Sequence, residues 1–454
     1  MFQEEVVVFT VTLFSQNGKS IYKNLSELNR DTFNEFVPPE KNLNATIKLL
    51  NNKGIHIEAF SEVGITGSCN KELFEKIFNT KVNKTKVRGI QEGEYFTYET
   101  VDEISIPKEF CYVEKITMPR QMFVLNEEIR PELPYFHYTV PDGVQKIAKK
   151  KLIDSLDRDR KSCNVCIVDT GLYKHNHFLK HNYDISVESA VSFFDPEKDE
   201  RGHGTGMTAV LLSNIEKSRV TMIKASNLNW SYPVAALQKA SKYNFDVLNC
   251  SWGIMGFEPQ AYLEIANIIR KGTIVIFSCG NGSTDRKKSF LQTIAYPEIL
   301  SVGGCMVNED GSIEVSDISS SYDSDIFPNR HAPDLCGICG KLPYAQVILM
   351  PIQPAALFDY ENGKRDGTKQ DDGWFVSSGT SAAAAYVSGL VANIIETNLI
   401  DREEIVQVLK KACKTVNSGQ NFMGEIPTGK KTDSATGGGF LDFESILNYM
   451  GYSF

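Results

Sequence analysis

The chain has 454 residues, of which 42% are hydrophobic and 23% are charged, and its formal net charge at pH 7 is -9. This length and composition predict a folded protein with one large domain and one smaller domain, and they argue against a disordered chain. The negative charge excludes a surface built to neutralise phosphates or anionic lipids, so we expect neither a nucleic-acid partner nor a membrane partner.

The N-terminal stretch MFQEEVVVFTVTLF places two acidic residues before its apolar residues. It lacks the basic start, the long apolar run and the small-residue cleavage site of a secretory signal. No window approaches the roughly 18 apolar residues that a membrane-spanning helix requires. The ten cysteines are scattered, and several lie in apolar strand-like runs, so no disulfide framework is expected. We therefore expect a cytoplasmic protein.

Residues 1–117 predict a small α+β domain. A strand pattern at residues 6–14 is followed by helical spacing at 41–53, by two strands within 55–68, and by a helix that Asn70 is suited to cap. Residues 94–107 are expected to supply the last strand, which gives the β-α-β-β-α-β order of a ferredoxin-like sandwich. Residues 118–140 are rich in proline and lack a sustained period, so they are expected to form an exposed linker.

Residues 141–454 predict an α/β domain with a doubly wound, mainly parallel sheet and helices on both faces. The strand-like runs are NVCIVDTG, RVTMIKAS, FDVLNCSWG and TIVIFSCGN, and helices are expected at 231–243 and 257–271. Continuous apolar strands joined by helices are typical of a parallel sheet that is covered on both sides. Catalytic groups in such sheets lie at the carboxyl ends of strands and at the adjacent helix N-termini.

Three residues fall where that architecture would expose reactive groups. Asp169 ends a strand, His203 begins an apolar helix, and Ser381 begins the alanine-rich helix in SSGTSAAAAYVSG. Serine is a weak nucleophile that needs a base, and the base needs an acceptor to orient it. Asn281, in SCGNGS, could donate to a developing oxyanion together with the backbone N–H of Ser381. Each residue taken alone also fits a helix cap or a turn.

In this order, VDTG, GHGTG, SWG, CGNG and SGTSAAAA resemble the subtilisin-like serine proteases, over residues 138 to 450. The resemblance implies a subtilisin-like fold in which Asp169 orients His203, His203 is the general base and Ser381 is the nucleophile. It places Asn281 and the Ser381 N–H in the oxyanion hole. It also implies that four residues contact the substrate: Ser251, Trp252, Gly253 and Gly280. Taken alone, Trp252 is typical of a core residue.

The resemblance further implies that residues 1–117 are a propeptide, which acts as folding chaperone and inhibitor. Such a chain is a zymogen that cuts its own linker, here near Phe136 or elsewhere within 124–140. Sedolisins share SGTS but replace the histidine by glutamate and the oxyanion asparagine by aspartate, so this chain sides with the subtilisins. It departs from the usual subtilisin pattern at Ala385, where proline commonly stands, and we expect activity to survive that change.

The predicted function is therefore a serine endopeptidase whose partners are a peptide or protein substrate and its own propeptide. Maturation of a particular peptide or protein is one form of this function. Two alternatives stay open. One is a pseudoprotease that binds peptides and retains its propeptide, which an intact triad disfavours. The other is a peptide ligase or macrocyclase that passes the acyl group to an amine.

Other polar clusters suggest metal sites only superficially. The spacing of His175, His177 and His181 invites zinc, but solvated histidines in an exposed loop are the favoured interpretation. The pair Cys163 and Cys166 straddles a strand and would face opposite sides, so joint ligation with the pair at 336 and 339 is disfavoured. The acidic insertion at 359–372 is expected to be a flexible surface loop without the spacing of a calcium site. No cofactor is required for the chemistry, and no metal site is predicted.

Overall fold

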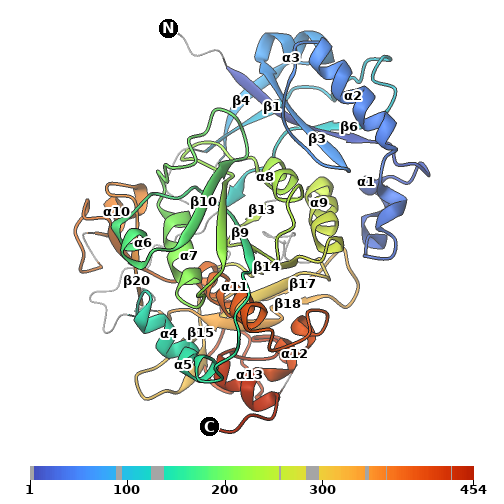
Figure 1. Ribbon diagram of the computed structural model, residues 1–454. Coiled ribbons are helices and arrows are strands. Elements are labelled where there is room, and N and C mark those ends of the chain that lie inside the picture. Colours follow the sequence, from blue (N-terminus) through green and yellow to red (C-terminus); the bar gives the residue numbers. More distant parts are fainter. Residues whose placement is uncertain are drawn as a thin grey trace.

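The structure is a computed structural model that describes residues 5–87, 95–123, 138–254, 257–282, 296–342, 347–363, 366–430 and 432–454. In Figure 1 the N-terminal module lies at the top, the large α/β domain lies below it, and the C-terminus is at the opposite end. The predicted fold class, a subtilisin-like α/β domain preceded by a small α+β region, is confirmed. None of the helices in the described ranges is both long and apolar enough to cross a membrane.

The N-terminal module contains a four-stranded antiparallel sheet in the order β2-β3-β1-β6, built from β1 (Val6–Leu13), β2 (His56–Phe60), β3 (Gly64–Asn70) and β6 (Val113–Thr117). Its helices are α1 (Ile21–Asn24), α2 (Glu40–Asn52) and α3 (Lys71–Phe78), and two short 3-10 turns span Leu25–Glu27 and Phe33–Phe36. Asn70 caps α3 as predicted, because its side chain accepts a hydrogen bond from the Leu73 N–H at 2.8 Å. Phe74 and Phe78 of α3 pack on Phe9 of β1.

The prediction for the last strand of this sheet is wrong. Within residues 94–107, β5 (Tyr95–Thr100) pairs with β4 (Val82–Val87) in a separate hairpin, and β6 completes the sheet instead. The alternating pattern indicates a strand but does not identify its partner. The buried face of β5 packs on the large domain, where the ring of Tyr98 stacks on Trp230 with centroids 5.1 Å apart.

The large domain is built on a mainly parallel sheet in the order β10-β11-β9-β12-β14-β15-β16, with β19 beside β15. Only the β15–β16 pair in this sheet is antiparallel. The strands are β9 (Asn164–Asp169), β10 (Asp184–Ser189), β11 (Arg219–Lys224), β12 (Val247–Cys250), β14 (Ile274–Ser278), β15 (Leu300–Val307), β16 (Ile313–Val315) and β19 (Leu335–Ile338). Smaller pairings use β7 (Met122–Phe123), β8 (Tyr138–Thr139), β13 (Gly253–Ile254), β17 (Tyr322–Asp323), β18 (His331–Ala332), β20 (Ile348–Pro351) and β21 (Trp374–Ser377).

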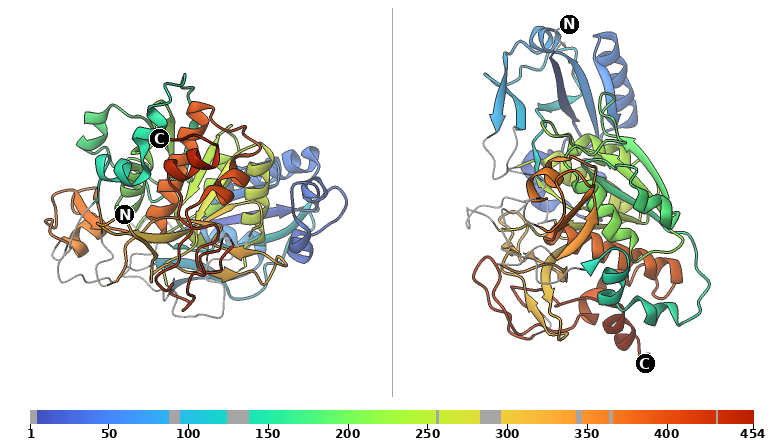
Figure 2. Two further views of the ribbon diagram at one scale, coloured as in Figure 1. Left: turned by 90° about the horizontal axis from the view of Figure 1, so that it is seen from below. Right: turned by 90° about the vertical axis from the view of Figure 1, so that its left-hand side faces the viewer.

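Helices cover both faces of this sheet, as Figures 1 and 2 show. They are α4 (Asp142–Ala148), α5 (Lys150–Asp154), α6 (Asn176–His181), α7 (His203–Leu212), α8 (Pro233–Ala240), α9 (Pro259–Arg270), α10 (Leu357–Asn362), α11 (Thr380–Thr397), α12 (Ile405–Ala412) and α13 (Phe443–Tyr449). Each face has its own apolar core, one containing α7 and α11 and the other containing α8 and α9. Cys163 belongs to the first core and Cys166 to the second, which confirms that they face opposite sides.

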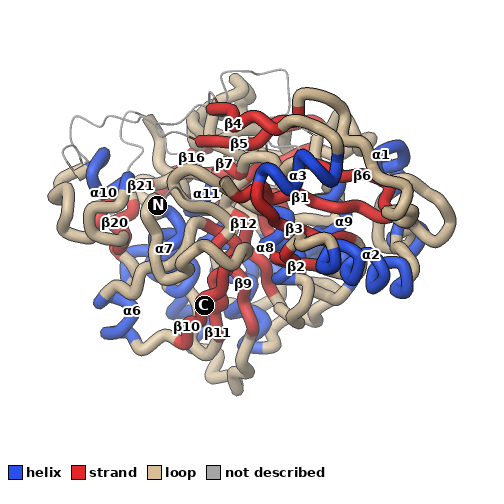
Figure 3. Tube along the Cα trace, turned by 90° about the horizontal axis from the view of Figure 1, so that it is seen from above, coloured by secondary structure: helices blue, strands red, loops and turns tan. Residues whose placement is uncertain are grey.

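The N-terminal module sits on α8 and α9 of the large domain, and Figure 3 looks down on it. Buried hydrogen bonds cross this contact. Thr12 donates to Gln260 at 2.8 Å, Thr66 donates to Gln238 at 2.8 Å, and Ser61 donates to Glu264 at 2.9 Å. Gly64 is needed at this contact because a Cβ there would lie 2.3 Å from the Gln260 amide nitrogen.

Candidate active site

Asp169 and His203 form a buried hydrogen-bonded pair at the carboxyl end of the sheet. Asp169 is the last residue of β9 and His203 is the first residue of α7, and His203 Nδ1 lies 2.8 Å from Asp169 Oδ1. The carboxylate can only accept, so Nδ1 carries the proton and Nε2 carries the lone pair. Among the described residues, Nε2 is buried without a hydrogen-bond partner. The imidazole is therefore oriented as a base.

Ser381, the second residue of α11, is bonded to Ser251. The Ser381 hydroxyl donates to the Ser251 carbonyl oxygen at 3.0 Å, and the Ser251 hydroxyl donates to the Ser381 carbonyl oxygen at 2.9 Å. The structure thus contains the Asp169–His203 hydrogen bond of the predicted triad. Among the described contacts, it does not contain the second one, between Ser381 and His203. Catalytic hydrogen bonds in unliganded sites commonly form only with substrate. Proton transfer to His203 requires the Ser381 hydroxyl to turn away from Ser251.

The helix that carries Ser381 is held by close packing. All residues of α11 except Ile395 are buried, and the four alanines after the serine are completely inaccessible. Gly389 lets α11 approach α7, because a Cβ there would lie 2.5 Å from the Leu211 carbonyl oxygen. The small side chains therefore fix α11 against the helix that begins with His203.

Asn281 lies just after β14, beside the start of α11. Its Oδ1 accepts from the backbone N–H and the hydroxyl of Thr380, both at 2.7 Å. Because a backbone N–H only donates, this contact assigns Oδ1 and turns Nδ2 toward Gly379, where a Cβ would lie 2.7 Å from it. Gly379 also has a φ of +137°, which favours glycine. An amide donor is thus held next to the helix start that carries Ser381.

The four residues expected to contact substrate are placed differently from one another. Trp252 is 1% exposed and its Nε1 donates to the Val168 carbonyl at 2.6 Å, so its indole is a core group. Gly280 donates its N–H to the Thr380 hydroxyl at 3.1 Å. Gly253 pairs with Phe123 in the antiparallel β13–β7 contact, so the chain's own segment lies on the strand that was expected to bind substrate.

A metal site is not evident at the histidine cluster. His175 Nδ1 accepts from the His177 N–H at 3.1 Å, and both rings pack edge-on against Trp374. These two side chains are buried, so the expectation of solvated histidines is wrong for them. Burial lowers the pKa of His177 to about 4. In the parts of the chain that the structure describes, no group of three or more His, Cys, Asp or Glu is placed to hold a metal ion.

The acidic insertion is more ordered than expected. Asp359 and Asp366 are completely buried, and they accept backbone N–H groups of Ala355 and Val376, each at 2.8 Å. The prediction of a flexible surface loop is therefore wrong for these two residues, because their side chains are buried and accept backbone hydrogen bonds. Phe358, on α10, lies with its ring 6.3 Å from that of His203. The sequence does not predict its contact with His203, since no motif marks it.

The chain is similar to known proteins both in sequence family and in fold. The model of the family described as the subtilase family matches residues 160–425. A sequence search of curated proteins found no match. Among solved structures, fervidolysin from Fervidobacterium pennivorans, a keratinolytic enzyme related to subtilisin, aligns with a TM-score of 0.59 and 13% identity. That alignment covers 98% of this chain and 61% of fervidolysin, so this chain spans about three fifths of its length.

A second structure is the epidermin leader peptide processing serine protease from Staphylococcus aureus. It aligns with a TM-score of 0.57 and 15% identity over 99% of this chain and 100% of that one. At these identities the two structures show a shared fold. The family model covers more than half of the chain and all of the residues assigned to the triad. The chain therefore belongs to the subtilase family, as its motifs predict.

Proposed function

We propose that the chain hydrolyses peptide bonds through an acyl-enzyme on Ser381. The observation that carries this proposal is the buried Asp169–His203 hydrogen bond of 2.8 Å, which leaves Nε2 free to act as the base. The pair lies at the carboxyl end of the sheet, where α11 also begins with Ser381 in its first turn. Ser381 Oγ attacks the scissile carbonyl while His203 Nε2 takes its proton. His203 then protonates the leaving amine, and water repeats the sequence on the acyl-enzyme.

The negative charge that develops on the carbonyl oxygen needs donors that are already in place. The backbone N–H of Ser381 belongs to the first turn of α11, where N–H groups lack intrahelical partners. Asn281 supplies the second donor, Nδ2, because Thr380 holds its Oδ1. Asp169 stabilises the imidazolium that forms on His203. This chemistry uses side chains and backbone alone and requires no cofactor.

We further propose that residues 1–117 act as an inhibitory propeptide and folding chaperone. The support is the β7–β13 contact, in which Phe123 pairs with Gly253 and Met122 pairs with Ile254. Gly253 is two residues from Ser251, whose carbonyl contacts Ser381. Met122 is fully buried and its N–H donates to the Ser231 hydroxyl at 2.7 Å. The pairing of Met122 and Phe123 with β13 supports the proposal that this segment occupies the position of a substrate.

The processing site is expected within residues 124–140. Phe136, the position suggested by the sequence, lies outside the described residues. The direction of the β7–β13 pair favours a cut closer to Phe123 than to Val140. Intact mass and N-terminal sequencing of the processed protein measure this position, and a new terminus outside 124–140 would contradict the proposal.

The test of autoprocessing compares purified wild type with Ser381→Ala. We expect wild type to separate into two fragments while Ser381→Ala stays full length. Dilution distinguishes cleavage within one molecule from cleavage between molecules. Equal processing of both proteins in pure form would refute the proposal, because the cut would then come from another protease.

For the substrate, we propose a particular peptide or precursor protein. The Staphylococcus aureus neighbour is named as a leader-peptide processing protease, which shows that a fold of this size supports such a role. Mass spectrometry of products distinguishes hydrolysis from ligation or cyclisation. Tight peptide binding without turnover by the processed chain would instead indicate a pseudoprotease.

A further inference from the structure

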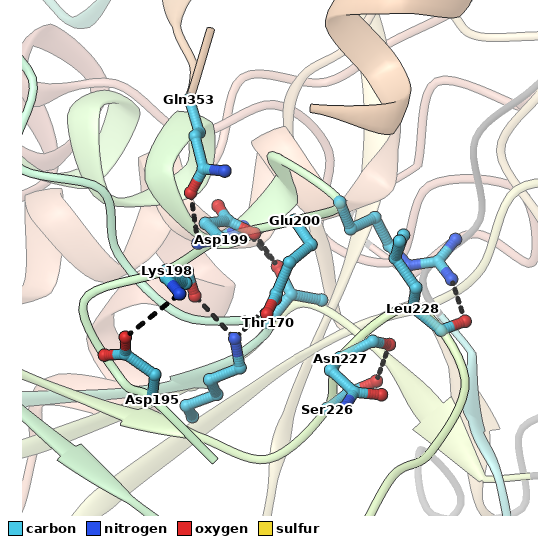
Figure 4. Close-up of polar contacts among 12 residues, drawn as sticks. Thr170, Asp195, Lys198, Asp199, Glu200, Ser226, Asn227, Leu228 and Gln353 are labelled. Carbon is cyan, nitrogen blue, oxygen red and sulfur yellow. Dashed lines mark hydrogen bonds and ion pairs between the residues drawn. The ribbon is translucent and has the colours of Figure 1, made fainter. Parts of the chain in front are cut away.

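Asp199 is a buried carboxylate outside the predicted triad. It lies four residues before His203, in the segment that precedes α7, and it is 0% exposed. Figure 4 shows it between Thr170 and Gln353, where segments from three parts of the chain meet. The sequence motif GHGTG begins after it, so motif reasoning does not include it.

Both oxygens of Asp199 accept hydrogen bonds from residues next to the catalytic pair. Oδ1 accepts from the Thr170 hydroxyl at 2.7 Å and from the Gly202 N–H at 2.8 Å. Oδ2 accepts from the N–H and the hydroxyl of Thr205, both at 2.7 Å. Thr170 directly follows Asp169, and Gly202 directly precedes His203. One carboxylate therefore ties the end of β9 to the start of α7.

The Thr170 hydroxyl extends this connection. It donates to Asp199 and accepts from the Gly204 N–H at 2.9 Å. The N-cap position of α7 is Gly202, which has no side chain to cap the helix, so Asp199 satisfies the first-turn donor of Thr205 instead. The backbone on both sides of His203 is thus held relative to the residue that follows Asp169.

The surroundings leave this loop little freedom to relax. Gly202 has a φ of +93°, and a Cβ there would lie 2.1 Å from Ile352. A Cβ on Gly204 would lie 2.2 Å from the Gly171 carbonyl oxygen. The N–H of Asp199 donates to Gln353 Oε1 at 2.8 Å, which ties the loop to the segment between β20 and α10.

All four donors to Asp199 are neutral groups, and no cation pairs with this carboxylate among the described residues. Burial raises the pKa of Asp199, its hydrogen bonds to Thr205 and Thr170 lower it, and repulsion by Asp169 adds to the raising effect.

We propose that Asp199 is a positioning residue for the catalytic pair: its carboxylate holds the first turn of α7 against the end of β9 and thereby sets the Asp169–His203 hydrogen bond. It does not touch substrate. This inference rests on the proposed peptidase activity, and it names a residue beyond the triad on which that activity depends.

Asp199→Asn is the direct test. Asparagine has the same size as aspartate, but it has one accepting oxygen where the carboxylate has two, and four donors point at this side chain. An NH2 group then faces donors in either orientation. We expect kcat to fall by about tenfold to a hundredfold with KM within about threefold, as for a small misplacement of catalytic groups. Thr170→Val, which removes only the connecting hydroxyl, should show the same pattern more weakly.

Glu396→Gln is the matched control. Glu396 is also 0% exposed, and it accepts the backbone N–H groups of Glu216 and Lys217 and the hydroxyl of Ser218, but it lies at the end of α11 remote from Ser381. We expect this variant to lower Tm without changing kcat or the pH profile. Equal losses of kcat in Asp199→Asn and Glu396→Gln, or a loss in Asp199→Asn that appears in KM and not in kcat, would overturn the proposal.

A readout independent of turnover separates this proposal from the proposed function. In the Ser381→Ala chain, the NMR resonance of the His203 Nδ1 proton reports its bond to Asp169. We expect Asp199→Asn to shift or broaden that resonance and Glu396→Gln to leave it unchanged. If wild type is inactive but the resonance responds as expected, the peptidase proposal fails and the positioning role stands; an unresponsive resonance overturns the positioning role even if the wild type is active.

Discussion

Ser381 and Ser251 exchange two hydrogen bonds, one from each hydroxyl to the carbonyl oxygen of the other residue, at 3.0 and 2.9 Å. Ser381 is therefore bonded directly to the segment that leads to β13. Gly253 of β13 pairs with Phe123. The candidate nucleophile, β13 and the segment around Phe123 thus belong to one continuous arrangement.

Ser251→Ala removes one of these two bonds and keeps the other, whose acceptor is the backbone. Asn249 also loses an acceptor for its amide. We expect a loss of about 1 kcal/mol in the free energy of unfolding and a decrease in kcat of at most about tenfold. Chemical denaturation and steady-state kinetics measure the two effects. A loss of activity as complete as that of Ser381→Ala would show that the Ser251 hydroxyl itself has a catalytic role.

Asn281→Asp distinguishes the accepting role of the Asn281 amide oxygen from the donating role proposed for its nitrogen. An ionised aspartate still provides an oxygen to accept from Thr380, but unlike a protonated one it cannot donate to an oxyanion. In the ionised form we expect kcat to fall by about 100-fold to 1000-fold, with KM nearly unchanged and Tm lowered by the buried charge. Asn281→Ala loses the Thr380 contact as well and should also lower Tm. Unchanged kcat in Asn281→Asp would remove Asn281 from the oxyanion hole.

Gly379→Ala tests the packing that holds Asn281. A methyl group at this position meets the Asn281 amide nitrogen at 2.7 Å and has an unfavourable φ of +137°. We expect a loss of about 1–3 kcal/mol in stability together with a strong decrease in kcat. Gly272→Ala is the control, because Gly272 has a φ of +93° but a Cβ there would meet no atom within 4 Å. It should lose stability and keep its kcat, and a similar decrease in kcat would contradict the assigned cause.

The buried carboxyl of Glu264 should make the contact between the N-terminal module and α9 depend on pH. Its Oε1 accepts from Ser61, Gln238 and Gln260, whereas its Oε2 has no partner among the described residues. Burial raises its pKa from 4.5 to about 7, and its hydrogen bonds oppose this rise. The docked form therefore favours the protonated carboxyl. Docking should be most stable below about pH 4.5 and should weaken as pH rises to about 7.

Hydrogen exchange of β3 in the Ser381→Ala chain, corrected for intrinsic rates, measures this dependence. Glu258, also on the buried side of this contact, has its pKa raised to about 7 by burial and contributes in the same direction. Glu264→Gln should make the dependence shallower, and the double variant with Glu258→Gln should make it nearly flat. A pH dependence that is identical in wild-type and double-variant backgrounds would assign the effect to other groups.

The sequence predicts the parallel sheet well because buried strands are continuous apolar runs, such as the one that ends at Asp169. It also predicts the Asn70 cap, since that signal is local. The pairing of β5 with β4 was missed because an alternating pattern indicates a strand without identifying its partner. The contact of Tyr98 with Trp230 leaves no local pattern either, since the two residues are more than a hundred positions apart.

The candidate site, like the fold, can be predicted only in part from the sequence. Residue types and motif order identify Asp169, His203 and Ser381 as candidates, but they do not reveal that the Ser381 hydroxyl is bonded to Ser251 in the resting structure. Asp199 and Phe358 carry no local signal of their position, because burial and contacts decide it. Trp252 belongs to a motif whose backbone borders the site, yet its indole lies in the core.

The most direct test of the central claim is labelling of the processed protein with a fluorophosphonate, followed by peptide mapping. We expect a single adduct on Ser381 that is absent from His203→Ala whose linker has been cut by an added protease, because the hydroxyl reacts only when the imidazole accepts its proton. Absence of an adduct on Ser381, or equal labelling of His203→Ala, would contradict the claim that these residues form an active serine peptidase site.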